Sequence, residues 1–177
     1  MKYSLRNGKT VIIRKPTIED AEALIAVMTI ADTETLFLAR NPGEFSATVD
    51  QEKKKIESVL SDNDAEWFVA EYENKVIGQC SVGLVRRSAR YRHRAEVAFV
   101  ILQDYCNLGI GGKMMEECIS WCRKMGVMQM ELDVVKNNEK ALKMYKDFGF
   151  EIIGIREHAL RYQDGSYADE YLMVKKL

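Results

Sequence analysis

The stretch from Glu96 to Gly126 constrains the fold of this chain more than any other part of the sequence. It begins with an apolar run over residues 97–102 in which both alternating sets of side chains are apolar. This pattern predicts a central strand that is buried on both faces. Glycines and then a helical pattern follow, and Gly126 is a suitable stop for that helix. The apolar stripe of the helix consists of Ile110, Met114, Cys118, Trp121, Cys122 and Met125.

The predicted helix begins beside Gly109, Gly111 and Gly112, with no Ser, Thr or Asp close to them as an N-cap. Its first backbone N–H groups therefore lack side-chain partners, and such a helix start can bind an anion. Asn107 and Met114 stand where a P-loop requires Gly and then Ser or Thr, and the late position in the chain does not fit a dinucleotide fingerprint. A plain chain reversal explains the glycines equally well, so the loop alone leaves both interpretations open.

The segment Cys106-Asn107-Leu108-Gly109-Ile110-Gly111 resembles the pyrophosphate loop of the GNAT superfamily of acyl-CoA-dependent N-acetyltransferases. That loop reads Gln or Arg, two residues, Gly, one residue, then Gly or Ala, and Cys106 stands at the usual Gln or Arg position. Phosphates in such a loop are held mainly by backbone N–H groups, so the glycines matter more than that side chain. The resemblance implies that acetyl-CoA, the acyl donor, is bound by Val100, Ile101, Leu102, Asn107, Leu108, Gly109, Ile110, Gly111, Gly112 and Lys113.

A second motif follows the predicted half-buried strand over residues 128–134. Asn138, Ala141 and Tyr145, followed by Phe148-Gly149-Phe150, resemble the GNAT motif at the start of the next helix. The resemblance implies that Asn138 contacts the cofactor arm, that Ala141 packs near it, and that Tyr145 lies beside the thiol as the acid for the departing thiolate. Without the neighbouring Asn138 and Gly149, Tyr145 would be interpreted as a core tyrosine.

The order of elements predicts one α/β domain over residues 1–177, because this length suits a single core. A first strand spans 9–15, a helix follows an approximate capping box at Thr17 and Asp20, and a second helix starts at Thr48 with Gln51 three residues on. Strands over 67–71 and 76–85 form a hairpin, and strands over 151–157 and 167–176 form the last one. The resemblance implies a GNAT-like mixed, mostly antiparallel sheet flanked by helices, with a splayed parallel strand pair that binds acyl-CoA.

Acyl transfer to an amine requires a base for the amine, donors for the oxyanion and an acid for the thiolate. Glu96, at the start of the cofactor strand, is the candidate base. An ion pair with Arg92 or Arg94 is an equally good interpretation of its charge. The oxyanion would take a backbone N–H near Ile101 or Leu102, which a splayed strand leaves unpaired.

The acceptor is an amine, and the resemblance places its contacts in the aperiodic segment 32–46. The candidate contacts are Glu34, Phe37 and Glu44, whose carboxylates suit a small cationic amine. A peptide amine is also compatible, since residues 94–97 and 164–170 weakly resemble the branch containing spermidine and ribosomal-protein N-acetyltransferases. A solvated loop without acceptor contacts is the alternative.

Composition and charge exclude several other classes of function. A net charge of −1 and 47% hydrophobic residues argue against a chain-wide nucleic-acid surface, although Arg86 to Arg94 could bind RNA or form a solvated reversal. The four cysteines match no disulfide scaffold, and Cys118 and Cys122 predict apolar packing rather than a metal site. No apolar signal core or membrane-length run is present, so we expect a cytoplasmic protein, compatible with a homodimer, and no membrane partner.

The main alternative function is a non-catalytic acyl-CoA-binding regulatory domain.

Overall fold

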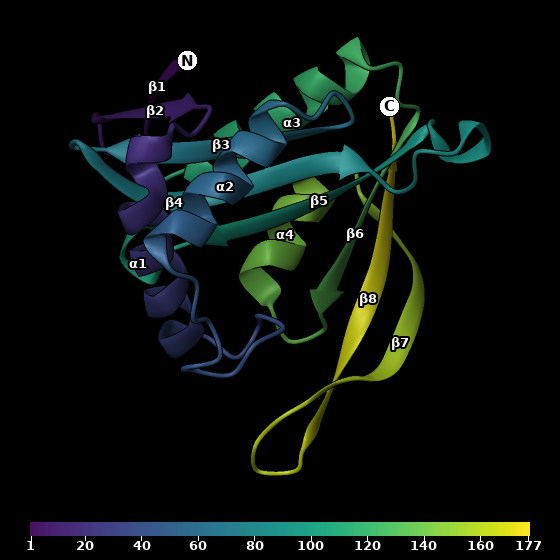
Figure 1. Ribbon diagram of the computed structural model, residues 1–177. Coiled ribbons are helices and arrows are strands. Elements are labelled where there is room, and N and C mark those ends of the chain that lie inside the picture. The colour runs from purple at the N-terminus through teal and green to yellow at the C-terminus, as the bar shows by residue number, and fades with distance from the viewer.

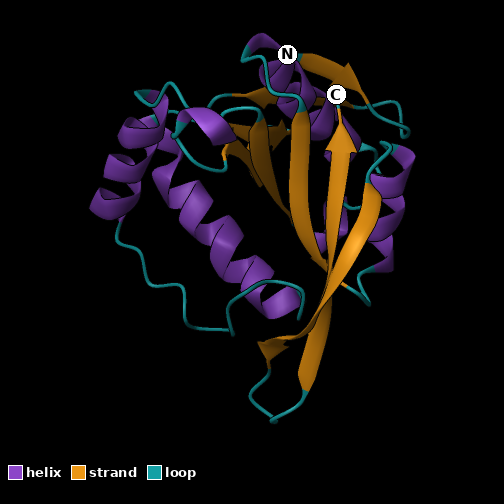
Figure 2. Cartoon of the chain, turned by 90° about the vertical axis from the view of Figure 1, so that its right-hand side faces the viewer, coloured by secondary structure: helices purple, strands orange, loops and turns teal.

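The computed structural model describes residues 1–177, and its centre is an eight-stranded sheet with helices on both faces (Figures 1 and 2). The strands are β1 (Lys2–Ser4), β2 (Thr10–Arg14), β3 (Ala65–Tyr72), β4 (Lys75–Leu84), β5 (Arg94–Ile101), β6 (Gln129–Val135), β7 (Glu151–Arg161) and β8 (Tyr167–Lys176). The main helices are α1 (Ala21–Glu34), α2 (Val49–Leu60), α3 (Ile110–Lys124) and α4 (Glu139–Asp147). The order across the sheet is β1-β2-β3-β4-β5-β6-β8-β7, and only β5 and β6 are parallel. The predicted fold class is confirmed.

The two faces of the sheet carry separate apolar cores. Phe68 and Ala70 of β3 pack with α3 and α4, whereas Trp67 and Val69 pack with α1 and α2. This division follows from strand geometry, because successive side chains point to opposite faces. The larger core lies on the face of α3 and α4 and includes the apolar stripe of α3, so the predicted helix over the glycine stretch is confirmed.

β5 and β6 separate after a short parallel pairing. Only Arg94 to Glu96 pair with Gln129 to Glu131, although β5 continues to Ile101 and β6 to Val135. Figure 1 shows the two strands side by side at one end and diverging at the other, with α4 behind the opening. The predicted splayed parallel pair is therefore present at the centre of the sheet.

The expectation that the strand over 97–102 is buried on both faces is wrong. Val97 is buried, but Ala98 is exposed and Phe99, Val100 and Ile101 are half-buried. The physical reason is the divergence of β6, which removes the neighbouring strand along this part of β5. An all-apolar run predicted the central position of β5 correctly, but it could not reveal the gap.

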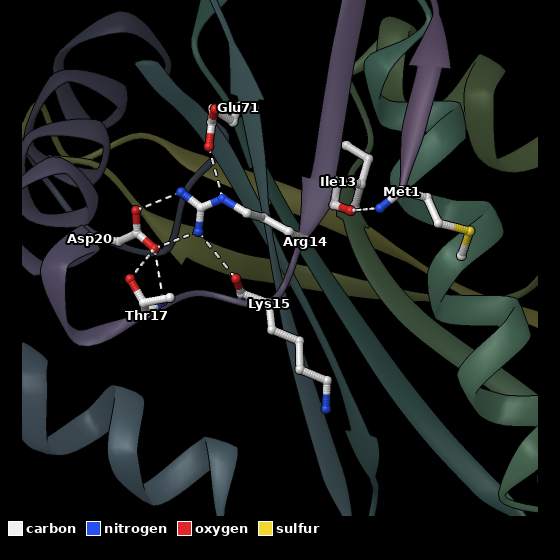
Figure 3. Close-up of polar contacts among 7 residues, drawn as sticks. All are labelled: Met1, Ile13, Arg14, Lys15, Thr17, Asp20 and Glu71. Carbon is white, nitrogen blue, oxygen red and sulfur yellow. Dashed lines mark hydrogen bonds and ion pairs between the residues drawn. The ribbon is translucent and has the colours of Figure 1, made fainter. Parts of the chain in front are cut away.

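The corner between β2 and α1 is fixed by one arginine (Figure 3). The Arg14 guanidinium donates to both carboxylate oxygens of Asp20, at 2.7 and 2.8 Å, and to Glu71 of β3 at 2.8 Å. The Thr17 backbone N–H also donates to Asp20, at 2.7 Å, so the predicted capping interaction is confirmed. Burial alone would raise the pKa of Asp20, but the hydrogen bonds from Arg14 and Thr17 outweigh it and hold this pKa below its ordinary value.

The remaining elements differ from the predictions mainly at their ends. The capping box at Thr48 and Gln51 opens α2, and β3 and β4 form the predicted hairpin with left-handed residues at Glu73 and Asn74. β1, which no pattern indicated, pairs with β2 and extends the sheet edge. None of the helices is both long and apolar enough to cross a membrane.

Candidate active site

The glycine loop ends in a helix start whose first N–H groups have no side-chain cap. Asn107 and Gly109 both adopt left-handed backbone conformations, with φ of 64° and 92°, and Gly109 caps α3 without a side-chain hydrogen bond. The first helical bond runs from the Lys113 N–H to the Gly109 carbonyl, at 3.2 Å. The N–H groups of the preceding three residues therefore have no partner within the helix, and the helix dipole favours an anion beside them.

The glycines of this loop serve different purposes. A Cβ on Gly111 would lie 2.8 Å from the Met144 sulfur, so glycine allows α3 and α4 to pack closely there. A Cβ on Gly112 would make ordinary contact with Phe148 at 3.5 Å, whereas a Cβ on Gly109 would meet nothing within 4 Å. Gly109 is the one whose backbone conformation itself requires glycine, because its φ is strained for any residue with a Cβ.

Tyr145 lies in the core on the face of α3 and α4, beside the gap between β5 and β6. Only 8% of the residue is exposed, and its ring packs against Phe99 of β5 and Phe150, with centroid separations of 6.2 and 5.9 Å. Its hydroxyl makes no hydrogen bond within the chain. Every fully buried side-chain oxygen does have a partner, so the Tyr145 hydroxyl oxygen keeps some exposure to solvent. Burial, together with nearby Cys118 and Cys80, raises the pKa of Tyr145 well above its ordinary range.

Alternation along β5 determines which amide groups face the gap. The Leu102 N–H donates to the Ile77 carbonyl of β4 at 3.1 Å, so the expectation that it is unpaired is wrong. Because alternate residues of an antiparallel strand direct their amides to opposite sides, the N–H groups of Phe99 and Ile101 face away from β4. β6 has already diverged at this level, so these two donors lie beside the opening.

Asn138 forms the N-cap of α4, shortly after the end of β6 at Val135. Its side-chain oxygen accepts the Ala141 N–H at 3.2 Å, and its amide nitrogen makes no hydrogen bond within the chain. Ala141 is half-buried against the larger core. The predicted cofactor residues of the second motif therefore border the same gap as Tyr145.

Glu96 lies on the face of the sheet opposite to Tyr145. Its neighbours Ala95 and Val97 belong to the core of α3 and α4, so the intervening Glu96 points to the other face, where it is exposed. The alternative ion pairs with arginine do not form. Arg92 binds Asp64 at 2.8 Å, and Arg94 binds Glu131, leaving the Glu96 carboxylate without a partner in the chain.

Sequence reasoning missed further charged residues on this open face. Glu131 of β6 is directly opposite Glu96 in the parallel register, and Asp133 follows two residues later. Asp133 binds Arg156 at 2.7 Å, and Glu170 of β8 binds the same arginine at 2.8 Å. The alternation of Glu131 and Asp133 with apolar residues was the only signal in the sequence, and it does not reveal which face is open.

The predicted acceptor residues lie in and beside the α1–α2 loop, and the carboxylates of two of them already accept hydrogen bonds within the chain. Glu34 accepts the Gln103 backbone N–H at 2.8 Å. Glu44 accepts both the backbone and side-chain N–H groups of Asn41, at 3.1 and 2.6 Å, and these bonds lower its pKa. Phe37 is 40% exposed. Their contact with an acceptor stays a prediction.

The arginine-rich segment 86–94 is largely neutralised by the chain itself. Arg87 binds Asp62 at 2.7 Å, Arg92 binds Asp64, and Arg94 binds Glu131. Arg86 lies over the Tyr91 ring at 4.8 Å. These contacts favour the interpretation of this segment as a reversal fixed to its surroundings over an RNA-binding surface.

A mixed sheet split at one parallel pair, with an uncapped helix start at the mouth of the split, is typical of acyl-CoA-dependent acyltransferases. Residues 30–150 match the model of the Acetyltransferase (GNAT) family, and the chain belongs to this family. The predicted membership of the superfamily of acyl-CoA-dependent N-acetyltransferases is therefore confirmed.

Individual relatives agree with this assignment. The L-amino acid N-acetyltransferase AaaT of Escherichia coli is 33% identical over 110 residues, which cover 61% of this chain and 66% of that relative, slightly under two thirds of its length. A GNAT-family acetyltransferase of Streptococcus pneumoniae is 27% identical, with a TM-score of 0.88 over 94% of this chain and 99% of that one. The Salmonella typhimurium protein yncA, solved with its cofactor acetyl-CoA, is 18% identical, with a TM-score of 0.82 over 94% of each chain.

Proposed function

We propose that this protein transfers the acetyl group of acetyl-CoA to a primary amine by direct attack of the amine on the thioester. One observation carries the proposal: the gap between β5 and β6 has the unbonded hydroxyl of Tyr145 on one side and the unpaired carboxylate of Glu96 on the other. The two kinds of group that acyl transfer requires, a proton donor and a proton acceptor, thus flank a single opening.

Acetyl-CoA would bind with its pyrophosphate at the start of α3, over the N–H groups from Leu108 to Lys113. Its pantetheine arm would enter the gap between residues 100–102, at the end of β5, and Asn138, the N-cap of α4, where the free amide nitrogen of Asn138 can donate to it. Cys106 does not prevent this arrangement, because the N–H groups and the dipole of α3 are present without a side chain at that position.

The reaction would form one N–C bond and break one C–S bond. The protonated amine loses one proton to Glu96, directly or through water, and its nitrogen attacks the thioester carbon. The nitrogen then loses a second proton to solvent as the neutral amide forms. The N–H groups of Phe99 and Ile101, which face the gap, would stabilise the oxyanion. Collapse of the tetrahedral intermediate breaks the C–S bond and expels the CoA thiolate, which takes the proton of the Tyr145 hydroxyl. A proton from solvent then restores this hydroxyl. The raised pKa of Tyr145 keeps this proton in place at neutral pH.

The acceptor would approach from the face that carries Glu96, because Tyr145 and α4 occupy the opposite face. Glu131, Asp133 and Glu170 surround this approach with carboxylates, only partly neutralised by Arg94 and Arg156. A small cationic amine or a peptide amine suits such a surface. The activity named for the AaaT relative supports including free L-amino acids among the acceptors tested.

A non-catalytic acyl-CoA-binding regulatory domain is the second candidate, and Cys106 at the usual Gln or Arg position favours it. One experiment separates the two: CoA release from acetyl-CoA is measured with polyamines, L-amino acids, aminoglycosides and peptide N-termini, and CoA binding is measured by calorimetry. Amine-dependent CoA release supports the acetyltransferase. Binding without release from any acceptor would favour the regulatory domain.

We also propose a homodimer as the state in solution. β7 is an edge strand of the sheet, and Ile152, Ile153 and Ile155 on it are exposed. Exposed apolar residues on an unpaired edge favour association. Light scattering after size exclusion tests this, and a monomer at micromolar concentration would contradict it.

A further inference from the structure

The end of α1 and the turn that precedes the glycine loop cap each other. Gln103 begins a short 3-10 helix, Gln103–Tyr105, and the residue before it, Leu102, has no side-chain acceptor to serve as an N-cap. The Glu34 carboxylate supplies that acceptor from another element, taking the Gln103 N–H at 2.8 Å. In return, the Gln103 side-chain amide donates to the Glu34 carbonyl at the last turn of α1.

These contacts connect two regions that the reaction requires. Glu34 is the last residue of α1, and the α1–α2 loop begins directly after it. On the other side, the Gln103 carbonyl accepts the Cys106 N–H at 3.0 Å, and Cys106 opens the glycine loop. Leu36, two residues after Glu34, accepts the Tyr162 hydroxyl of the β7–β8 hairpin at 3.1 Å. The α1–α2 loop is thus attached to the hairpin at Leu36, and the end of α1 is attached through Glu34 to the 3-10 turn that precedes the glycine loop.

We propose that Glu34 is a positioning residue that holds the glycine loop in the conformation that binds the CoA pyrophosphate. This inference rests on the proposed function. Glu34 would act through Gln103 and without touching CoA. Removing the Glu34 carboxylate leaves the 3-10 turn uncapped, so the loop conformation that binds CoA becomes less populated. The apparent dissociation constant for CoA then rises in proportion to the loss of that population.

The test compares Glu34→Ala, Glu34→Gln and the control Glu22→Ala, which removes an exposed carboxylate from the first turn of the same helix. Calorimetry with CoA gives the binding constant of each variant. We expect about fivefold to tenfold weaker binding for Glu34→Ala, since a charged cap is lost at a partly exposed site. Glu34→Gln keeps an acceptor oxygen and should bind within about twofold of the wild type. Glu22→Ala should bind like the wild type.

Two further measurements exclude a merely structural effect. With the acceptor at a fixed concentration, the KM for acetyl-CoA should rise in Glu34→Ala by about the same factor as the dissociation constant of CoA, because the glycine loop is no longer held in position. In the ligand-free protein, hydrogen exchange should quicken at residues 103–108 and stay unchanged in β3.

Wild-type CoA affinity in Glu34→Ala, with the wild type itself binding CoA, would overturn the proposal. A wild type that fails to bind CoA would instead overturn the proposed function. In that case hydrogen exchange still tests the role of Glu34. Unchanged exchange at residues 103–108 in Glu34→Ala would show that Glu34 does not hold the loop.

Discussion

The side chains of Glu96 and Tyr145 lie on opposite faces of the sheet, on the two sides of the gap between β5 and β6. Tyr145 packs on Phe99 in the core of α3 and α4, whereas Glu96 is exposed on the face of α1 and α2. Proton removal from the amine and proton delivery to the thiolate would therefore occur on different faces. The two substrates would meet within the gap, so acetyl-CoA and the amine can be bound at the same time.

Tyr145→Phe should lower kcat and leave acetyl-CoA affinity nearly unchanged. The ring keeps its packing, but a positioned proton donor is lost, which typically costs on the order of 10² to 10⁴ in rate. We expect the lower end, because a CoA thiol leaves partly unaided. The measurement is kcat with CoA affinity in parallel, and Tyr72→Phe, a buried tyrosine whose hydroxyl accepts from Asn7, is the control. Equal turnover in Tyr145→Phe and wild type, with chemistry rate-limiting, would reduce Tyr145 to a packing residue.

Glu96→Gln should slow the reaction most at neutral pH and less in alkali. At neutral pH an alkyl amine is protonated and needs a base, whereas at high pH it is already neutral. The expected loss in kcat/KM is about 10²-fold near neutrality, with CoA affinity retained. The pH profile of kcat/KM for both proteins checks this. Parallel profiles with equal rates would assign the proton transfer to water alone.

Gly109→Ala should weaken CoA binding more than Gly126→Ala does. Both glycines flank α3 with positive φ, of 92° and 70°, and neither Cβ would meet an atom within 4 Å. Each substitution should therefore cost roughly 1–2 kcal/mol of unfolding free energy through the left-handed backbone. Only Gly109 belongs to the loop that presents the N–H groups. Equal CoA affinity in the two variants would remove Gly109 from the phosphate site.

Asp20→Asn should destabilise the protein by about 2 kcal/mol above pH 5, and the difference should shrink in acid. The folded-state pKa of Asp20 lies below its ordinary value of 3.8, so its charge stabilises the fold fully above that value. The stabilisation is lost as the pH falls through the folded-state pKa and the carboxylate is protonated. Urea unfolding of both proteins at several pH values measures the difference. A difference that stays constant down to about pH 2 would contradict this account.

Most of the helices and strands, and their order, can be predicted from local patterns in the chain. The glycine helix, the Asn138 cap of α4 and the capping box at Thr48 and Gln51 each depend on residues within a few positions of one another. Local hydrogen bonds and side-chain periodicity decide such elements, so a pattern in the chain suffices to predict them. The two GNAT-like motifs then predicted the superfamily and the splayed pair.

The positions of the site residues relative to one another depend on contacts between distant segments. The partner of Glu34 is Gln103, 69 positions away, and the residue that a Cβ on Gly111 would meet, at 2.8 Å, is Met144 on another helix. The exposure of Glu96 depends on which face of β5 packs against α3 and α4, and the orientation of the Phe99 and Ile101 N–H groups depends on the register with β4. These relationships arise from packing and register between distant segments. No periodicity within one segment encodes them, because each segment is compatible with many partners until the sheet is assembled.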